Sequence, residues 1–296
     1  MVLHPQALAS LAAQPPGPRN FEAGFDIEAT RTQARADAAR EPREPVAGVV
    51  DLDADGVPVR LYRPADALPG VVVHLHGGGF VFGDVDIHDA AVRRLALASG
   101  VAVLSVDYRR PPEHRFPAAP DDVTTVLRWL EGAAASLDLS GPVSLHGDSA
   151  GGNLALVAAL RGPARIASLV LIYPFLDPEA GYASYATETQ GFDAREAAWF
   201  WDQYAAPDAD RRHPDLAPLR SSRLAELPPT LILTAEHDPL RDEGEDLAAR
   251  LADLGVRVEA VRVLGMLHGF WRHPRAFDAA GLVTRTVAGF LKSQHL

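Results

Sequence analysis

Short apolar runs rich in β-branched residues alternate with longer stretches of helical periodicity from residue 71 onward. Within most of these runs hydrophobic residues occupy successive positions, which is typical of strands covered by helices on both faces. The alternation predicts an α/β fold in which a mainly parallel central sheet is flanked by helices. The predicted strands are residues 71–77, 101–108, 142–148, 168–174, 229–236 and 256–264, and the clearest predicted helices are residues 117–134, 150–161 and 241–255.

Three segments depart from this alternation. Residues 1–45 are rich in Ala, Pro and Arg with little apolar periodicity, so we expect an arm attached to the main domain. Residues 46–64 predict two strands joined at an Asp-Gly pair, which is the strongest short signal for a hairpin. Residues 178–222 are far longer than a crossover connection needs, and we expect them to form an inserted helical segment.

The composition is that of an ordinary soluble globular protein. Of the 296 residues 47% are hydrophobic and 23% are charged, and 28 basic against 39 acidic residues give a net charge of -11. This acidity argues against nucleic acid or an anionic membrane surface as the main partner. The sequence has no cysteine, no signal-peptide pattern and no apolar stretch of about 20 residues, so we expect a cytoplasmic protein that does not enter a membrane.

The stretch LHGDSAGGN places one serine among three glycines, where a predicted strand ends and a predicted helix begins. Gly147, Ser149 and Gly151 fit G-x-S-x-G, the nucleophile elbow, in which a sharp strand-to-helix turn exposes the serine hydroxyl at the carboxyl end of the sheet. A serine that only caps the helix is the alternative. Because the strand and the helix stand in the order that the elbow requires, Ser149 is the candidate nucleophile.

A serine hydroxyl becomes a good nucleophile only when a base takes its proton and an acid orients that base. With this elbow, the acid and then the histidine follow the serine along the chain. Asp238 comes just after one predicted strand and His268 just after the last, so they are the candidate acid and base. Glu236 and Asp242 are the alternative acids, and His273 is the alternative base.

The stretch HLHGGGF follows another predicted strand with three successive glycines. Glycines cost conformational entropy, so three together indicate that the backbone approaches something closely. An HGGG-type loop supplies N–H groups to the oxyanion hole of proteins with the serine elbow, and the residue after the nucleophile supplies another. The candidate donors are therefore Gly78, Gly79 and Ala150, with His76 and Gly77 completing the motif.

These motifs and their order resemble the hormone-sensitive-lipase-like family of α/β-hydrolases, the bacterial family IV esterases. The likeness runs from VVVHLHGGGF to HGFW and includes DYRRPPEHRFPAAPDD and TAEHDPLRDEG. It implies an α/β-hydrolase fold in which residues 46–177 and 223–296 form the catalytic domain, while the arm of residues 1–45 and the inserted residues 178–222 form a helical cap. Asp148 fits the GDSAG pattern of the family, and we expect it to hold neighbouring loops by hydrogen bonds.

The other aromatic residues have a less specific pattern. Phe80, Phe82, Trp199 and Tyr204 are candidate residues of a substrate pocket. The aromatic residues of the inserted segment could line an acyl pocket beneath the cap or equally well pack within the cap itself; they are Phe192, Trp199, Phe200, Trp201 and Tyr204.

The remaining histidines give no sign of a metal site. His74 and His146 are expected to be packed, hydrogen-bonded histidines rather than ligands. No H-E-x-x-H spacing, Walker loop or G-x-G-x-x-G pattern occurs in the sequence, so no metal and no cofactor are expected.

We therefore predict a serine carboxylesterase in which Ser149 attacks the ester carbonyl, His268 transfers the proton and Asp238 orients His268. The expected partner is a small-molecule ester, with short to medium acyl chains implied by the family resemblance, and a homodimer is compatible with the sequence. An amide-cleaving relative, such as an arylformamidase or a small peptidase, would use the same residues. A lipase would need a more apolar lid, and a non-catalytic small-molecule receptor would typically have lost a triad residue.

Overall fold

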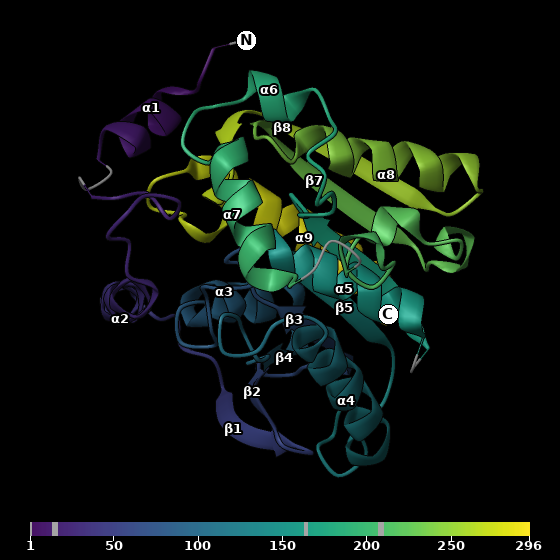
Figure 1. Ribbon diagram of the computed structural model, residues 1–296. Coiled ribbons are helices and arrows are strands. Elements are labelled where there is room, and N and C mark those ends of the chain that lie inside the picture. Colours follow the sequence, from purple (N-terminus) through teal and green to yellow (C-terminus); the bar gives the residue numbers. More distant parts are fainter. Residues whose placement is uncertain (1, 14–16, 163–164, 207–209) are drawn as a thin grey trace.

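An eight-stranded sheet runs through the centre of the computed structural model, which describes residues 2–13, 17–162, 165–206 and 210–296 (Figure 1). The strands are β1 (Gly48–Ala54), β2 (Val57–Arg63), β3 (Leu68–Leu75), β4 (Val101–Val106), β5 (Val143–Asp148), β6 (Ile166–Ile172), β7 (Thr230–His237) and β8 (Val258–Leu267). Their order is β1-β2-β4-β3-β5-β6-β7-β8. Strand β2 pairs antiparallel with β1 and β4, and the other neighbours are parallel. The mainly parallel sheet and the antiparallel hairpin expected from the sequence are confirmed.

Helices cover both faces of this sheet. They are α3 (Asp89–Ser99), α4 (Ala118–Ala133), α5 (Ala150–Arg161), α8 (Arg241–Asp253) and α9 (Asp278–His295). Helices α4, α5 and α8 share one hydrophobic core with Val71 and Val73, whereas α3 and α9 share the other core with Val72. Because successive residues of a strand point to opposite faces, neighbouring valines of β3 enter different helical layers. The central strands are therefore apolar at successive positions, as the sequence pattern indicated.

Strand β8 is less covered than its apolar sequence predicted. Val261 is 43% exposed and Leu264 is 63% exposed, while the last three residues, 265–267, are buried. The prediction that helices cover both faces is wrong for most of this strand, because β8 lies at the edge of the sheet and pairs with β7 alone. The buried end of β8 leads directly into the loop that begins with His268.

Two segments outside the sheet contact each other. The arm contains α1 (Pro5–Ala12) and α2 (Ile27–Ala38), and residues 178–222 contain α6 (Ser184–Thr187), α7 (Ala194–Tyr204) and the short 3-10 helices η1 (Asp210–Arg212) and η2 (Pro218–Arg220) (Figure 1). A guanidinium nitrogen of Arg19 lies 3.0 Å from Asp193 and another lies 2.5 Å from Glu196. Asp193 and Glu196 also form the capping box at the start of α7. Arg19 thus joins the arm to the first turn of α7.

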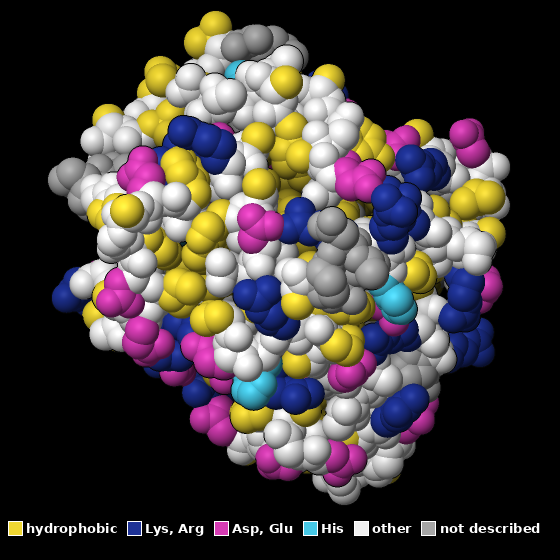
Figure 2. Space-filling view, in the orientation of Figure 1, with side chains coloured by type: hydrophobic (Ala, Val, Ile, Leu, Met, Phe, Trp, Pro, Cys, Tyr) yellow, Lys and Arg dark blue, Asp and Glu magenta, His cyan; other side chains and the backbone are white. Residues whose placement is uncertain are grey.

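Charged side chains of both signs are interspersed over the face shown in Figure 2, with hydrophobic side chains exposed between them. Across the described ranges, no helix has both the length and the apolar character that crossing a membrane requires.

Candidate active site

Ser149 forms the turn between β5 and α5 and has strained backbone angles. Its φ is 54° and its ψ is -120°, a conformation that residues with a Cβ rarely adopt. A Cβ added at Gly147 would lie 2.1 Å from the carbonyl oxygen of Gly151, and one added at Gly151 would lie 1.9 Å from that of Leu75. Only glycine fits at these two positions, so the close packing of β3, β5 and α5 depends on both.

The side chains of His268 and Asp238 reach Ser149 from the ends of β8 and β7. Nε2 of His268 lies 3.0 Å from Oγ of Ser149, and Nδ1 of His268 lies 2.7 Å from Oδ2 of Asp238. Asp238 is fully buried, and its Oδ1 accepts the N–H of Leu240 at 2.9 Å. With Nδ1 protonated and held by Asp238, Nε2 of His268 is free to accept the proton of the serine hydroxyl.

The alternative acids and the alternative base have other surroundings. Glu236 lies within β7 and accepts a backbone N–H of β8 at 2.7 Å. Asp242 lies in the first turn of α8, where it pairs with Arg241 at 2.8 Å. His273 is exposed and follows the short 3-10 helix η4 (Phe270–Arg272). The structure therefore brings Asp238 and His268 to the serine, and none of these three alternatives.

The glycine loop after β3 leaves backbone donors unused. The φ of Gly78 is 119°, and a Cβ there would lie 2.2 Å from the carbonyl oxygen of Phe82. Within the described part of the chain, the N–H groups of Gly78, Gly79 and Ala150 donate to no other residue. Gly78 and Gly79 line the same cavity as Ser149, so their backbone groups are available to a ligand.

Asp148 joins the serine turn to the glycine loop. Its Oδ1 accepts the N–H of Gly77 at 2.9 Å and lies 3.5 Å from Nε2 of His88. Burial by itself would raise the pKa of this carboxyl, but His88 and the positive charge of Arg272 hold the pKa well below its ordinary range. The ionised Asp148 therefore holds the glycine loop beside the turn at Ser149.

The neighbouring histidines are packed beneath this site. His74 and His146 are fully buried, and their Nδ1 atoms lie 2.9 Å apart, so one of them donates to the other. Burial lowers the pKa of His146 to about 4 and that of His74 well below its ordinary value, so both are neutral at pH 7. His76 is also fully buried and stacks on Tyr108 with ring centroids 4.1 Å apart.

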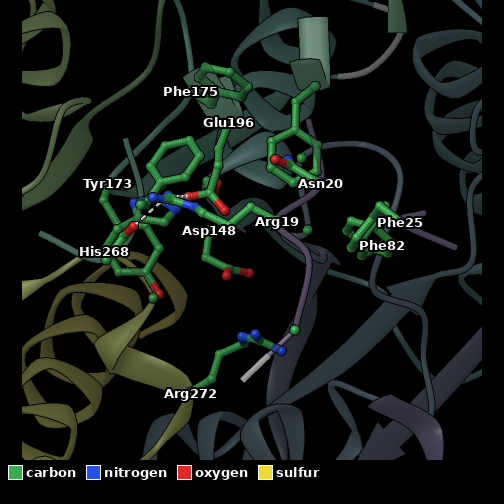
Figure 3. A pocket seen from close by; sticks show the side chains of 18 of the residues that line it. Arg19, Asn20, Phe25, Phe82, Asp148, Tyr173, Phe175, Glu196, His268 and Arg272 are labelled. Carbon is green, nitrogen blue, oxygen red and sulfur yellow. Dashed lines mark hydrogen bonds and ion pairs between the residues drawn. The ribbon is translucent and has the colours of Figure 1, made fainter. Parts of the chain in front are cut away.

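Ser149 lines a cavity of about 820 Å³. Figure 3 shows side chains of its wall, among them His268 and Asp148. Its wall combines residues of the arm, of the inserted segment and of the loops at the carboxyl ends of the strands. Aromatic rings make up much of this wall, and four charged side chains interrupt them. The residues that line the cavity are Gly17, Pro18, Arg19, Asn20, Phe25, Gly78, Gly79, Phe82, Asp148, Ser149, Tyr173, Phe175, Gly191, Phe192, Glu196, Phe200, His268, Gly269 and Arg272.

The structure places one of the four predicted pocket residues in the cavity wall. Phe82 lines the cavity, whereas Phe80 and Tyr204 are fully buried and stack on each other with ring centroids 3.8 Å apart. The ring of Trp199 stacks on that of Phe82, with ring centroids 6.2 Å apart, and Trp199 does not belong to the cavity wall. This corrects the prediction for Phe80, Trp199 and Tyr204, because the core and the cap, rather than the cavity, surround their rings.

Helical periodicity separates the aromatic residues of α7. Glu196 and Phe200 are one turn apart and both face the cavity, whereas Trp201 and Tyr204 belong to the hydrophobic core. Of the aromatic group that the sequence placed either at a pocket or within the cap, Phe192 and Phe200 line the cavity. The arm residues in the wall carry no comparable signal, because they lie outside regular secondary structure.

Known proteins resemble this chain over most of its length. The profile of a family described as alpha/beta hydrolase fold matches residues 72–272. Ethyl acetate hydrolase from Pseudomonas putida is 39% identical over 245 residues, which cover 78% of this chain and 77% of that protein. Esterase LipI from Mycobacterium tuberculosis is 38% identical over 272 residues, which cover 86% of this chain and 84% of that protein. The solved structure of a hyperthermophilic esterase from Pyrobaculum calidifontis matches with a TM-score of 0.88 at 37% identity, covering 99% of both chains. The chain belongs to the hormone-sensitive-lipase-like, or bacterial family IV, esterases of the α/β-hydrolase fold.

Proposed function

We propose that the protein is a serine carboxylesterase that hydrolyses short- to medium-chain acyl esters. The observation that carries this proposal is the series of contacts from Ser149 through His268 to Asp238, with distances of 3.0 Å and 2.7 Å, at a cavity wall. The similarity of the chain to an ethyl acetate hydrolase and to an esterase supports the same activity.

Proton transfer from Ser149 to His268 drives the first half of the reaction. His268 takes the proton of Ser149 at Nε2 while Oγ attacks the carbonyl carbon of the ester. Asp238 accepts a hydrogen bond from Nδ1–H of His268 and, without taking the proton, stabilises the imidazolium that forms. His268 then gives its proton to the departing alcohol oxygen, which leaves an acyl group on Ser149.

Backbone N–H groups stabilise the negative charge that develops on the carbonyl oxygen. The donors are Gly78, Gly79 and Ala150, and the last of these stands at the N-terminus of α5, where the helix dipole also favours negative charge. Removing one donor of this kind typically costs about 3 to 4 kcal/mol of transition-state stabilisation. Water, activated by His268, then hydrolyses the acyl-enzyme, and none of these steps needs a cofactor.

The cavity supports an ester of modest size. Its volume of about 820 Å³ falls within the range of small-molecule sites, roughly 300 to 1,000 Å³. Phe82, Phe175 and Phe200 provide apolar surface for an acyl chain. The arm of residues 1–45 and residues 178–222 together form the cap of this cavity.

The test is a series of p-nitrophenyl esters from acetate to palmitate. We expect the highest kcat/KM between acetate and octanoate, and a loss of at least about 10⁴-fold in kcat for Ser149→Ala. Ser136→Ala is the matched control, because Ser136 is exposed and lies outside the cavity wall. Wild-type turnover by Ser149→Ala would refute the proposed nucleophile. Faster cleavage of p-nitroacetanilide than of p-nitrophenyl acetate would identify an amidase instead.

A further inference from the structure

Arg272 is the charged residue of the cavity wall that lacks an ion-pair partner among the residues that the structure describes. The other charges of the wall are engaged. Arg19 and Glu196 neutralise each other at 2.5 Å, and Asp148 is held by a backbone N–H and by the imidazole of His88. Over the same described ranges, no carboxylate oxygen lies within 4.0 Å of the Arg272 guanidinium.

The backbone of Arg272 is anchored, although its side chain reaches into the cavity. The carbonyl oxygen of Arg272 accepts a hydrogen bond of 3.0 Å from the guanidinium of Arg94. The neighbouring Trp271 is buried, and its Nε1–H donates to the hydroxyl of Thr284 at 3.2 Å. Figure 3 shows the Arg272 side chain extending from the ribbon that also carries His268. The wall therefore presents a guanidinium from a fixed position.

The positive charge of Arg272 acts on the ionised Asp148 and on His88, but neither side chain forms a direct ion pair with the guanidinium. Burial and then the positive charge of Arg272 lower the pKa of His88, so His88 is neutral at pH 7 and adds no second positive charge. The guanidinium of Arg94 lies next to the backbone of Arg272, to whose carbonyl oxygen it donates. Among the described residues, the guanidinium of Arg272 is thus left without a carboxylate in direct contact, although the whole chain has a net charge of -11.

The chemistry of ester cleavage determines which part of a substrate meets this wall. His268 must protonate the departing alcohol oxygen, so that oxygen lies within hydrogen-bond reach of Nε2 of His268. The alcohol portion of the ester consequently lies beside the loop of His268, and Arg272 stands on this loop four residues later. The carbonyl oxygen points instead toward Gly78 and Gly79.

We propose that Arg272 binds a carboxylate on the alcohol portion of the substrate, so that the enzyme hydrolyses O-acyl esters of hydroxy acids. This inference rests on the proposed esterase function and specifies its substrate class. The planar guanidinium can donate two parallel hydrogen bonds to a carboxylate, which an ester with an uncharged alcohol portion cannot accept in the same way. The reaction itself is ordinary hydrolysis, which releases the hydroxy acid and the carboxylic acid of the acyl group.

The test compares 3-acetoxypropanoate with its methyl ester, in which the same carboxyl is uncharged, and measures the acetate released, so that cleavage of the methyl ester bond is not counted. Wild-type enzyme should have the higher kcat/KM on the anion. Arg272→Gln should lower kcat/KM on the anion by about tenfold, mainly through KM, and change that on the methyl ester by less than about twofold. Arg272→Lys should recover part of the loss. Arg275→Gln, which removes an exposed arginine of the same loop, is the control and should behave as wild type.

Each remaining outcome overturns a defined part of the proposal. Equal loss on both esters in Arg272→Gln would overturn the carboxylate site and leave the esterase function standing, as would a wild-type preference for the methyl ester. Dependence on Arg272 for monoethyl succinate, whose carboxylate is on the acyl side, but not for 3-acetoxypropanoate would overturn the placement. If wild type hydrolysed no ester at all, the proposed function would fail together with this inference.

Discussion

Replacing Ser149 by glycine should relieve backbone strain at the serine turn, whereas replacing it by alanine should not. The backbone of Ser149 has φ 54° and ψ -120°, which costs a residue with a Cβ roughly 1 to 3 kcal/mol and costs glycine almost nothing. Ser149→Ala removes the hydroxyl and keeps the strain. It is therefore the reference against which Ser149→Gly is measured.

The magnitude follows from the difference between these two variants. Both lose the hydrogen bond from Ser149 to His268, so that contribution cancels. Glycine loses about 0.5 to 1 kcal/mol relative to alanine, because its unfolded chain has more conformations. The strain relief exceeds this loss, so Ser149→Gly should have the larger free energy of unfolding, by about 1 kcal/mol. For a chain of this length the corresponding rise in Tm is about 2 °C.

Urea unfolding followed by circular dichroism measures this difference, and both variants should lack esterase activity. Ala249→Gly is the matched control, because Ala249 is an exposed residue of α8 with ordinary helical surroundings. There glycine should lower the free energy of unfolding by about 1 kcal/mol, the opposite sign. A Ser149→Gly variant that is less stable than Ser149→Ala would refute the strain at the turn.

Three further predictions concern catalysis, pH and the glycine loop. Asp238→Asn should lower kcat by about 10³- to 10⁴-fold with little change in KM for p-nitrophenyl acetate, because His268 loses the partner that fixes its tautomer; a loss below tenfold would contradict this role. Because burial lowers the pKa of His146 from 6.5 to about 4, the free energy of unfolding should fall by about 3 kcal/mol from this residue as the pH decreases through that interval. Urea titrations between pH 7 and 4 should show a shallower dependence for His146→Gln, and an equally steep one would be evidence against the assignment. In Gly79→Ala the new Cβ would lie 2.1 Å from the ring of Phe200, so kcat/KM should fall by about 100-fold and recover in part when Phe200→Leu is added; no recovery would rule out this steric cause.

The sequence predicted the meeting of Ser149, Asp238 and His268 because each follows the end of a parallel strand. The carboxyl ends of parallel strands lie at one edge of a sheet, so a residue just after each strand is brought to that edge by the topology itself. The glycine pattern around Ser149 is equally local, since it reflects contacts between β3, β5 and α5. Position relative to the strands was sufficient for these residues.

The wall of the cavity depended on contacts that the sequence does not reveal. Phe80 and Phe82 belong to the same loop, yet only Phe82 faces the cavity, and the φ of 65° at Phe80 belongs to a backbone turn that no residue pattern indicates. The sequence does not show that Arg272 lacks an ion-pair partner among the described residues, because this depends on how the other charged side chains of the wall pair with each other. The exposure of β8 follows from its place at the sheet edge, which depends on strand order rather than on its own residues.

The ion pairs of Arg19 with Asp193 and Glu196 join two segments of the chain that lie outside the central sheet. The proposed reacting groups are set by the ends of the strands, whereas much of the cavity wall comes from two peripheral segments that meet at Arg19. Insertions, deletions and substitutions in these segments alter the shape of the cavity without moving the turn at Ser149. One reaction centre can in this way acquire different substrate ranges in related proteins, through changes in the parts of the chain that contribute least to the central sheet.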